Sequence, residues 1–465
     1  MPRSRCALTS TTRRSLIHHR DFLQLWSAAT ISLFGSQVST IAIPTIAILT
    51  LGATTFEASL LFFFEMLPFI LFTLPAGVWV DRLRRRPILI AGDLGRAIAL
   101  ATIPIAYALG GLTVVQLYVV AFVTGVLTVF FDVADQSYLP ALLDADQLVE
   151  GNAKLQISQS AAQITGQGLG GAIIGLVTAP FAVVVDALSF VASAALIFAV
   201  RKPENPPEAR HEAGATDRRS MRSEIAEGLR YVLGHRYLRN IAACTGLSNL
   251  FSSLVFAVFF VYAFRVLGLS PLTLGIVFGI GNIGFLIGAF AAGRLPRLIG
   301  VGHTIVLSSL LSGLSVLPIA IAPASERSIP FLIVSQLGAG FTQVVYNVNQ
   351  VSLRQAITPE RIQGRMNATM RFIVWGTMPI GTILGGVLGT VAGLHETIWI
   401  GAIGGLFAFV PPLLSPVWGL REIPTGAEGS DLGGAVAGAG LPPAAIASIE
   451  AEADADEDRN GEESA

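Results

Sequence analysis

Glu65 is the residue of this chain best placed to do chemistry, because it is an acid inside a long apolar stretch, flanked by Phe62, Phe63, Phe64 and Pro68. Ionisable side chains in such a stretch are rare and are functional candidates by default. A carboxyl group shielded from water favours its neutral form. A group of this kind can load a proton on one side of a barrier and release it on the other. The alternative is a structural hydrogen bond to a neighbouring helix.

Two further acids, Asp132 and Asp135, are additional candidates for proton coupling. They lie three residues apart, a spacing that places both side chains on one face of a helix. Pairing with Arg96 or Lys154, in a gate or a structural contact, is the preferred interpretation of these two acids. Asp186 is a weaker candidate of the same kind.

Polar amides form a second set of candidates. Gln156, Gln159, Gln163 and Gln167 recur at spacings of 3, 4 and 4, which places them on one helix face. Four amides facing lipid are costly, so this face is predicted to line a cavity or a helix interface. Asn249 and Asn282 are expected to be hydrogen-bond partners between helices. The full set of predicted substrate-cavity residues is Gln37, Gln156, Gln159, Gln163, Gln167, Gln343, Tyr346 and Asn347, with Gln350 beside the last three.

The elements that must hold these residues are membrane helices. The chain is 52% hydrophobic and 13% charged, with a mean hydropathy of +0.66, whereas a soluble domain has about 25% charged residues. A span needs about 20 mostly apolar residues. We predict twelve spans, at residues 22–50, 56–80, 87–109, 113–134, 156–178, 181–200, 241–264, 272–293, 303–323, 329–351, 367–391 and 396–419. The fold class is therefore an all-α membrane protein.

The basic residues predict the orientation of these spans. If the N-terminus is cytoplasmic, all of the 30 Lys and Arg residues except Arg265 and Arg327 fall on or near the inner side. Short loops rich in Lys and Arg stay in the cytoplasm, so both termini are predicted to be cytoplasmic. The first apolar segment is too long for a signal peptide and is interpreted as a retained span. The excess of Arg over Lys and the abundance of Ala and Gly indicate a bacterial inner membrane.

Five regions follow along the chain: an N-terminal arm at 1–20, a six-helix half at 21–200, a linker at 201–240, a second six-helix half at 241–420 and an acidic tail at 421–465. The linker is predicted to be flexible at 203–220 and to form an amphipathic helix at 222–239 on the inner membrane surface. The tail buries too little apolar surface to fold and is predicted to be disordered.

The two halves repeat in sequence. An offset of 215 takes Asn152-Ala153 to Asn367-Ala368, and it takes Gly166, Gly170 and Gly171 to Gly381, Gly385 and Gly386. These six glycines are predicted to let helices pack closely. Two parallel six-span halves joined by a long inner loop are a known transporter construction. We therefore predict twelve transmembrane helices in two pseudo-symmetric six-helix halves around a central cavity.

The strongest motif lies between spans two and three and reads Gly77-Val-Trp-Val-Asp81-Arg82-Leu-Arg84-Arg85-Arg86. This segment resembles the inner-loop signature of the major facilitator superfamily. The resemblance implies a conformational latch in which Gly77 lets another helix approach closely, and a simple topology anchor is the alternative. The residues assigned to the latch are Gly77, Asp81, Arg82, Arg85, Arg86, Asp93, Arg96 and Arg371, and Arg371 is expected to meet an inner-loop acid such as Asp81.

Further motifs resemble one branch of that superfamily. The segment from Phe131 to Leu142, with Glu65-Met-Leu-Pro68 and with Asp93 and Arg96, is similar to enterobactin exporters and macrolide efflux proteins among the drug:proton antiporters. The resemblance covers roughly residues 20–420. Residues 166–171 are similar to an antiporter motif, but Gln167 stands where that motif has Pro. Any kink at this point must then come from glycine.

The resemblance implies a secondary transporter that exports a small amphipathic compound, such as a drug, a macrolide or a siderophore, in exchange for protons. A monomer is expected. The alternative is a metabolite importer or facilitator of the same fold, and a remote alternative is a non-transporting membrane sensor or scaffold. The sequence has no Gly-x-x-x-x-Gly-Lys-Ser/Thr phosphate loop, zinc triad or plausible Ser/His/Asp set. Neither an enzyme nor a cofactor, a metal ion or a nucleic-acid partner is predicted, and Cys6 and Cys244 give no disulfide framework.

Overall fold

The computed structural model of the chain describes residue 16 and residues 19–143, 147–202 and 221–423. Every regular element within these residues is helical, which confirms the predicted fold class. Most of the predicted arm, the flexible part of the linker and the tail from residue 424 lie outside the described residues. The expectations for those segments therefore stay predictions.

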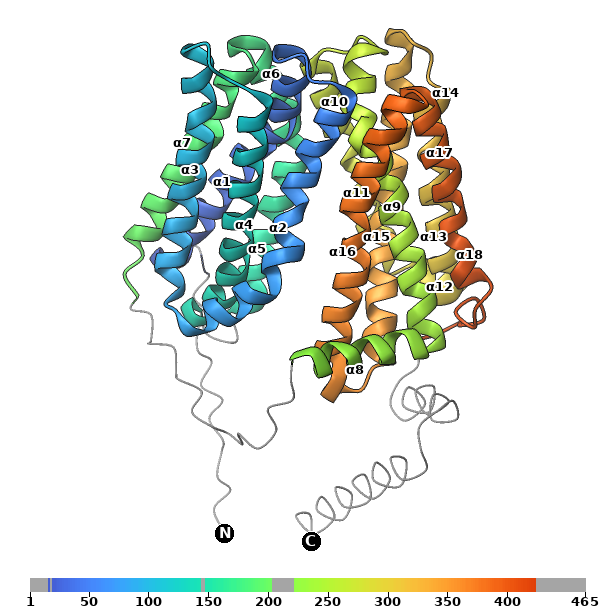
Figure 1. Cartoon of the computed structure of the whole chain (residues 1–465). Coiled ribbons are helices and arrows are strands. Elements are labelled where there is room, and N and C mark those ends of the chain that lie inside the picture. The colour runs from blue at the N-terminus through green and yellow to red at the C-terminus, as the bar shows by residue number, and fades with distance from the viewer. Residues whose placement is uncertain (1–15, 17–18, 144–146, 203–220, 424–465) are drawn as a thin grey trace, which may run out of the picture.

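The helices form two bundles that stand side by side (Figure 1). The first half contains α1 (Arg20–Thr45), η2 (Ile46–Thr50), α2 (Thr55–Arg82), α3 (Arg85–Ala108), α4 (Val114–Leu142), α5 (Leu148–Ala161), η3 (Ala162–Gly166), α6 (Gln167–Val177) and α7 (Ala179–Ala199). The helix α8 (Met221–Gly234) lies across one end of the second half (Figure 1). The second half continues with α9 (Arg236–Arg265), α10 (Pro271–Gly281), α11 (Ile283–Ala292), α12 (Leu295–Ile299), α13 (Val301–Leu314), α14 (Leu317–Ile321), η4 (Glu326–Ser328), α15 (Ile329–Ala356), α16 (Glu360–Val391), α17 (Leu394–Leu406), η5 (Phe407–Phe409) and α18 (Val410–Leu413).

Eleven helical segments among the described residues are long and apolar enough to cross a membrane. The chain is thus a multi-pass membrane protein. The predicted span five is not among these eleven. It is a continuous run of α5, η3 and α6, and its glutamine face lowers its hydropathy. The predicted count of twelve spans therefore stays a prediction.

Several helices extend beyond the apolar stretches that predicted them. The helix α4 runs to Leu142 rather than to 134, and α9 begins at Arg236 rather than at 241. Backbone hydrogen bonding continues where hydropathy ends, so the helices project past the apolar region. The amphipathic helix expected at 222–239 ends earlier, at Gly234, because His235 is the N-cap of α9. Span eight is divided into α10 and α11 at Asn282.

The predicted repeat reappears in the positions of the helices. The offset of 215 takes Val114, the first residue of α4, to Ile329, the first residue of α15, and it takes Ala179, which begins α7, to Leu394, which begins α17. Equivalent helices therefore begin at equivalent positions, as the pseudo-symmetry requires.

The repeated glycines also occupy equivalent helix contacts. A Cβ atom added to Gly170 would lie 3.0 Å from the Cα atom of Val38 on α1, whereas one on Gly385 would overlap the carbonyl oxygen of Leu254 on α9. Each of these two contacts lies within one half. Their neighbours Gly171 and Gly386 instead face the other half. A Cβ atom added to Gly171 would lie 2.6 Å from the carbonyl oxygen of Pro271 on α10. A Cβ atom added to Gly386 would overlap Ser59 of α2.

The two ends of the bundle differ in how the halves meet. We call the end with the α2–α3 connection and α8 the basic end, since Arg20, Arg86 and Arg236 lie there, and we call the other the distal end (Figure 1). At the distal end, Ile48, Ala58 and Phe62 of the first half share one buried apolar cluster with residues 258–264 of α9. At the basic end, each half has its own buried cluster. The structure is therefore closed at the distal end.

Candidate functional site

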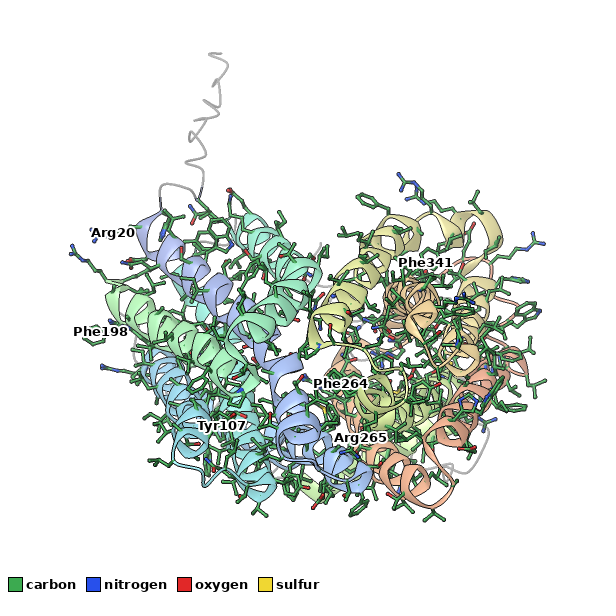
Figure 2. All side chains as sticks on the ribbon, turned by 90° about the horizontal axis from the view of Figure 1, so that it is seen from above. Arg20, Tyr107, Phe198, Phe264, Arg265 and Phe341 are labelled. Carbon is green, nitrogen blue, oxygen red and sulfur yellow. The ribbon has the colours of Figure 1, made fainter. Side chains whose placement is uncertain are left out.

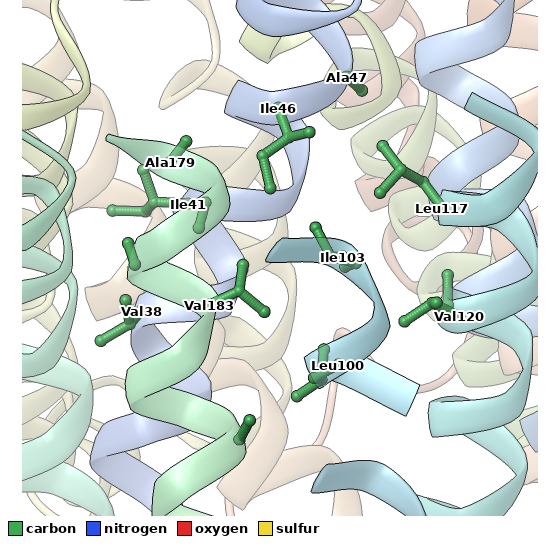
Figure 3. Close-up of a cluster of buried hydrophobic side chains, with 14 of the residues drawn as sticks. Val38, Ile41, Ile46, Ala47, Leu100, Ile103, Leu117, Val120, Ala179 and Val183 are labelled. Carbon is green, nitrogen blue, oxygen red and sulfur yellow. The ribbon is translucent and has the colours of Figure 1, made fainter. Parts of the chain in front are cut away.

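A central cavity of about 610 Å³ lies between the two halves. The first half contributes residues from α1, α2, α3, α4 and α7, and the second half contributes residues from α9 and α16. Apolar side chains such as Phe62, Phe256 and Met378 alternate with hydroxyl groups such as Thr40 and Thr124. Leu100 and Ala121 connect the wall to the buried core of the first half, which packs between α1, α3, α4 and α7 (Figure 3). A cavity of this size and lining suits one small amphipathic molecule.

Glu65 lies in the wall of the central cavity, and its side chain is exposed there. The helix α2 is held beside α4 at this level, because a Cβ atom added to Gly125 would lie 2.8 Å from the Cγ atom of Pro68 and 3.0 Å from the carbonyl oxygen of Glu65. Glycine at position 125 thus allows α4 to pack closely against α2 at the level of Glu65. Among the described residues, no side chain makes a hydrogen bond or an ion pair with the Glu65 carboxylate.

Arg96 and Asp93 form a buried ion pair on α3, with an Nη2–Oδ1 distance of 2.5 Å. The guanidinium carbon of Arg96 lies 4.3 Å from the ring centre of Phe131 and 4.2 Å from that of Phe190. Stacking between two rings stabilises a cation through their electron-rich faces. Arg96 also lines the central cavity, so the pair places a fixed positive charge in its wall. The latch predicted for these two residues remains a prediction.

Asp186 on α7 also lines the central cavity, although its residue is only 2% exposed. Its carboxylate accepts hydrogen bonds from the hydroxyls of Ser39 at 2.5 Å, Ser189 at 3.2 Å and Ser36 at 3.4 Å. Sequence reasoning ranked this acid below the others. Its importance depends on the hydroxyls of Ser36 and Ser39 in span one, and only the structure shows that these lie beside α7.

Asp132 and Asp135 lie on α4, and of the two cations predicted for them the structure places Arg96 within electrostatic range. Asp132 is exposed and lies within electrostatic range of both Arg96 and Arg371. Arg371 belongs to α16 of the second half, so this attraction acts between the halves. Lys154 is not the partner of either acid, because it forms an ion pair with Glu150 at 3.6 Å.

A side cavity of about 280 Å³ lies between α2 and α16, nearer the basic end. It is lined by Phe69, Ile70, Thr73, Asn367, Ala368, Arg371, Phe372 and Trp375. The guanidinium group of Arg371 stacks over Trp375 at 4.5 Å. The latch prediction paired Arg371 with Asp81, whose side chain lies outside the described residues. Arg371 stacks on Trp375 and lies within electrostatic range of Asp132.

The glutamine face of span five lies near the contact between the halves and is not part of either cavity lining described above. Gln156 and Gln159 are exposed. The amide nitrogen of Asn282 on α10 donates to the carbonyl oxygen of Gln163 and, at 3.2 Å, to Oε1 of Gln167. The expectation that Asn282 bonds between helices is confirmed. The π-helical η3 precedes Gln167, so the irregular backbone expected near the antiporter-like motif arises without proline.

The remaining cavity candidates also lie outside the two linings described here. Gln37 packs against η3, because a Cβ atom added to Gly166 would lie 2.7 Å from the Cβ atom of Gln37. Within the second half, the Tyr346 hydroxyl lies 2.7 Å from that of Thr245. The Gln350 amide donates to Oδ1 of Asn347 at 3.0 Å, and Gln343 is exposed. A role for these residues in substrate contact stays a prediction.

The motif between spans two and three forms the short connection from α2 to α3. Arg86 donates to the carbonyl oxygens of Ile197 and Phe198 at 3.2 Å and 2.5 Å, which ties the start of α3 to the end of α7. Gly77 has no described atom within 4 Å of an added Cβ atom, so the predicted close approach of another helix is absent in this conformation. The side chains of Asp81 and Arg82 lie outside the described residues, and Arg85 has partners of its own.

The distal end holds the halves together directly. Arg265 of α9 donates to the carbonyl oxygen of Ala53, in the connection between η2 and α2, at 2.6 Å. Figure 2 looks down on this end and shows Arg265 beside the first half. With the apolar cluster shared by both halves, this bond closes the distal side of the central cavity.

The lining of the central cavity combines apolar, hydroxyl and carboxylate groups, which together suit an amphipathic ligand and proton exchange. Among the described residues, no group of three or more His, Cys, Asp or Glu side chains is arranged to hold a metal ion. The groups that line the described cavity offer ligand binding and protonation.

Comparisons with known proteins place this chain among membrane transporters. It is 28% identical over 408 residues to the multidrug efflux pump Tap of Mycolicibacterium fortuitum, an alignment that covers 84% of this chain and 93% of that relative. It is also 28% identical over 373 residues to the pump of the same name in Mycobacterium tuberculosis strain ATCC 25618 / H37Rv, with 78% and 85% covered.

Solved structures share the fold at lower identity. A bacterial homologue of the iron transporter ferroportin in an inward-facing state matches with a TM-score of 0.65 and 17% identity, covering 86% of this chain and 99% of that one. The nucleoside transporter NupG matches with a TM-score of 0.64 and 14% identity, covering 85% and 99%. The profile of the transmembrane secretion effector family matches residues 11–421. The chain therefore belongs to the transmembrane secretion effector family of the major facilitator superfamily.

Proposed function

We propose that this protein exports a small amphipathic compound, such as a drug, a macrolide or a siderophore-like molecule, in exchange for protons. The single observation that carries the proposal is the central cavity, which places the exposed carboxylate of Glu65 among aromatic and hydroxyl side chains between the halves. The two relatives named as multidrug efflux pumps support export as the direction.

The orientation of the bundle supports the loading of substrate from inside the cell. Basic residues concentrate at the basic end, and loops rich in Lys and Arg stay cytoplasmic. We thus assign the basic end and both termini to the cytoplasmic side of a bacterial inner membrane. The closed distal end then faces outward. A compound from the cytoplasm enters the space between the halves, and rocking of one half against the other exposes it to the outside.

In this proposal Glu65 carries the proton. Its carboxylate faces the cavity and has no polar partner among the described residues, so it can bind a proton or a cationic ligand that enters the cavity. A cationic substrate and a proton would compete for this one carboxylate, and that competition would couple the two flows. Asp132 and Arg371 attract each other across the halves at the basic end, so they would favour its closure when the distal end opens.

The test uses inside-out vesicles that contain the purified protein and a pH-sensitive dye. An acid-inside gradient is established, and ethidium and erythromycin are added in turn as amphipathic probes. Release of protons on addition of a probe is expected for the wild type. Glu65→Gln should abolish this release, while exchange of labelled probe without a gradient continues, because exchange needs the cavity but no net proton movement.

Glu57→Gln is the matched control, because Glu57 lies on the same helix α2 at the distal end. Its carboxylate accepts hydrogen bonds from the backbone N–H and the hydroxyl of Thr54 at 2.7 Å and 2.8 Å, in a capping box outside the cavity. This variant should retain proton release. Proton-driven efflux by Glu65→Gln at the wild-type rate would exclude Glu65 as the carrier.

A further inference from the structure

The wall of the central cavity contains a second carboxylate, Asp186, in a pocket built by two helices. The hydroxyls of Ser36 and Ser39 on α1 and of Ser189 on α7 lie 2.5 to 3.4 Å from its two oxygens. The residue is 2% exposed, yet it lines the same cavity as Glu65. The carboxylate is therefore withdrawn from bulk water but adjoins the space through which a ligand would pass.

The close seating of α1 on α7 depends on glycine. A Cβ atom added to Gly35 would overlap the Oγ atom of Ser189 and would lie 2.8 Å from Oδ1 of Asp186. Any larger residue at position 35 would displace the hydroxyl that donates to the carboxylate. The three hydroxyls, the carboxylate and this glycine thus form one fitted arrangement.

The charged groups around this pocket leave Asp186 without a cation of its own. On α3, Arg96 pairs with Asp93 at 2.5 Å and reaches Asp186 only through its longer-range field. On α4, Asp132 faces both Arg96 and Arg371, and on α2 the cavity holds Glu65. The side chains of α1 that contact Asp186 are hydroxyls. A buried carboxylate without its own counter-charge is costly, so a bound proton or cation would stabilise this group in part of the cycle.

The contact distances favour a proton over a metal ion as that ligand. Calcium, for example, sits about 2.3–2.6 Å from each of its oxygen ligands, which must spread around it. Here the hydroxyl oxygens already touch the carboxylate oxygens directly, with Ser39 at 2.5 Å. No ion fits between atoms in contact. A proton needs no such space, and a serine hydroxyl can rotate to accept from a neutral carboxyl group.

We propose that Asp186 is a second proton-binding site of the transporter, separate from Glu65, which takes a proton from water in the central cavity and returns it there. The proposal rests on the proposed function, because loading and unloading matter only if protons drive export. With two carboxyls in one wall, export of one compound is exchanged for more than one proton. Ser36, Ser39 and Ser189 are positioning residues that hold the carboxyl group in either state.

The experiment is infrared difference spectroscopy on the purified full chain in lipid, without substrate and without a gradient. Spectra are recorded as the pH is lowered, and the carbonyl stretch of newly protonated carboxyl groups is followed. Asp186→Asn should lose one acid-induced band, and Glu65→Gln should lose a different one. Ser39→Ala should shift the band assigned to Asp186, because it removes the shortest hydrogen bond. Ser193→Ala, a fully buried change on the same helix, should leave the bands assigned to Asp186 and Glu65 unchanged.

The outcomes separate this proposal from the proposed function. A spectrum of Asp186→Asn identical to that of the wild type would overturn the second site, and so would a Ser39→Ala spectrum without a shift. The Ser39→Ala measurement decides the question even if Asp186→Asn does not fold. If Asp186→Asn loses the band but the wild-type protein releases no protons in the vesicle assay, proton-coupled export is refuted while the second site stands.

Discussion

The first and second halves share one helical plan but differ in where they carry charge. In the first half, Glu65, Arg96 and Asp186 line the central cavity. The offset of 215 takes these positions to Ile280, Leu311 and Gly401 in the second half. The second half instead contributes Ser252, Ser253, Phe256, Met378 and Thr382 to the lining.

This difference indicates a division of labour between the halves. Packing is repeated, because closely packed helices need glycine at the same points in both halves. Charge is not repeated, because one set of protonatable groups suffices for a cavity that both halves enclose. We therefore expect changes to charge to have large effects in the first half, whereas changes to packing should have similar effects in both.

The largest effect is expected for Arg96→Leu, which leaves Asp93 buried without its partner. Removing one partner of a buried ion pair costs about 3–5 kcal/mol, so the temperature of unfolding of the purified protein should fall strongly. The double variant Asp93→Asn with Arg96→Leu should recover part of the loss. Leu311→Ala, at the equivalent position of the second half, should have a much smaller effect. An Arg96→Leu protein as stable as the wild type would contradict the charge asymmetry.

The shared packing is tested by Gly171→Leu and Gly386→Leu, which both add a side chain between the halves at the distal end. Overpacking costs about 1–3 kcal/mol and acts only on the distally closed state. That state should therefore lose population in both variants to a similar extent. Spin labels at Leu109 and Val391, which are 80% and 81% exposed at the distal end, report the separation of the halves.

Gly175→Leu is the control for these two variants, because Gly175 lies on the same helix α6 as Gly171 and no described atom lies within 4 Å of its added Cβ atom. It should leave the label distances unchanged. If one of the two distal variants separated the halves and the other did not, the packing symmetry would be wrong even though the sequence repeat is real.

The stability of the second half is expected to depend on pH through His235, the N-cap residue of α9. Nδ1 of His235 accepts from the backbone N–H groups of Tyr237 at 3.3 Å and Leu238 at 3.5 Å. Burial, with a smaller effect of Arg236, lowers the pKa of His235 from its usual 6.5 to about 4. The neutral form is thus favoured in the folded protein, and stability present above pH 6.5 is lost as the pH falls toward 4.

The measurement is the temperature of unfolding of the wild type and of His235→Asn as the pH is lowered. A lost N-cap costs about 0.5–2 kcal/mol, and asparagine caps a helix without titrating. The variant should therefore lose less stability than the wild type on acidification. Identical profiles for the wild type and His235→Asn would contradict the assignment.

Much of the fold could be predicted from the sequence, because hydropathy and the glycine repeat report on lipid exposure and close packing directly. The helix starts at Val114 and Ile329 follow the offset that Gly166 and Gly381 first indicated. The helix ends were harder to predict. Arg236 and Leu142 lie beyond the apolar stretches of their helices. Hydropathy does not mark a helix end there, because the backbone hydrogen bonds continue into polar sequence.

The site could be predicted only for residues that stand out within the sequence of a single helix. Glu65 is an acid in an apolar stretch, and the structure places it in the cavity wall. Asp186 was ranked low because its partners, Ser36 and Ser39, lie on another helix about 150 positions away. The glutamine face was recognised by its spacing. Periodicity identifies a polar face but not what the face meets, and here Asn282 of the other half is one neighbour.

The smallest effect is expected for Asn282→Ala, which removes two hydrogen bonds between the halves. A hydrogen bond between membrane helices is worth about 0.6 kcal/mol on average, so the loss of both bonds corresponds to a shift of about eightfold in the distally closed population. Asn249→Ala is the matched control. Its amide donates to the carbonyl oxygen of Val374 at 3.1 Å, from α9 to α16 within the second half.

Both asparagine variants should lower the temperature of unfolding, and Asn282→Ala should lower it further because it loses two hydrogen bonds where Asn249→Ala loses one. Only Asn282→Ala should broaden the distances between labels at Leu109 and Val391. Its hydrogen bonds join the two halves in the distally closed state, whereas the bond of Asn249 lies within the second half and is kept when the halves separate. A shift of these distances by Asn249→Ala would mean that the second half does not move as a rigid unit. The comparison of the halves would then have to be replaced by one of individual helices.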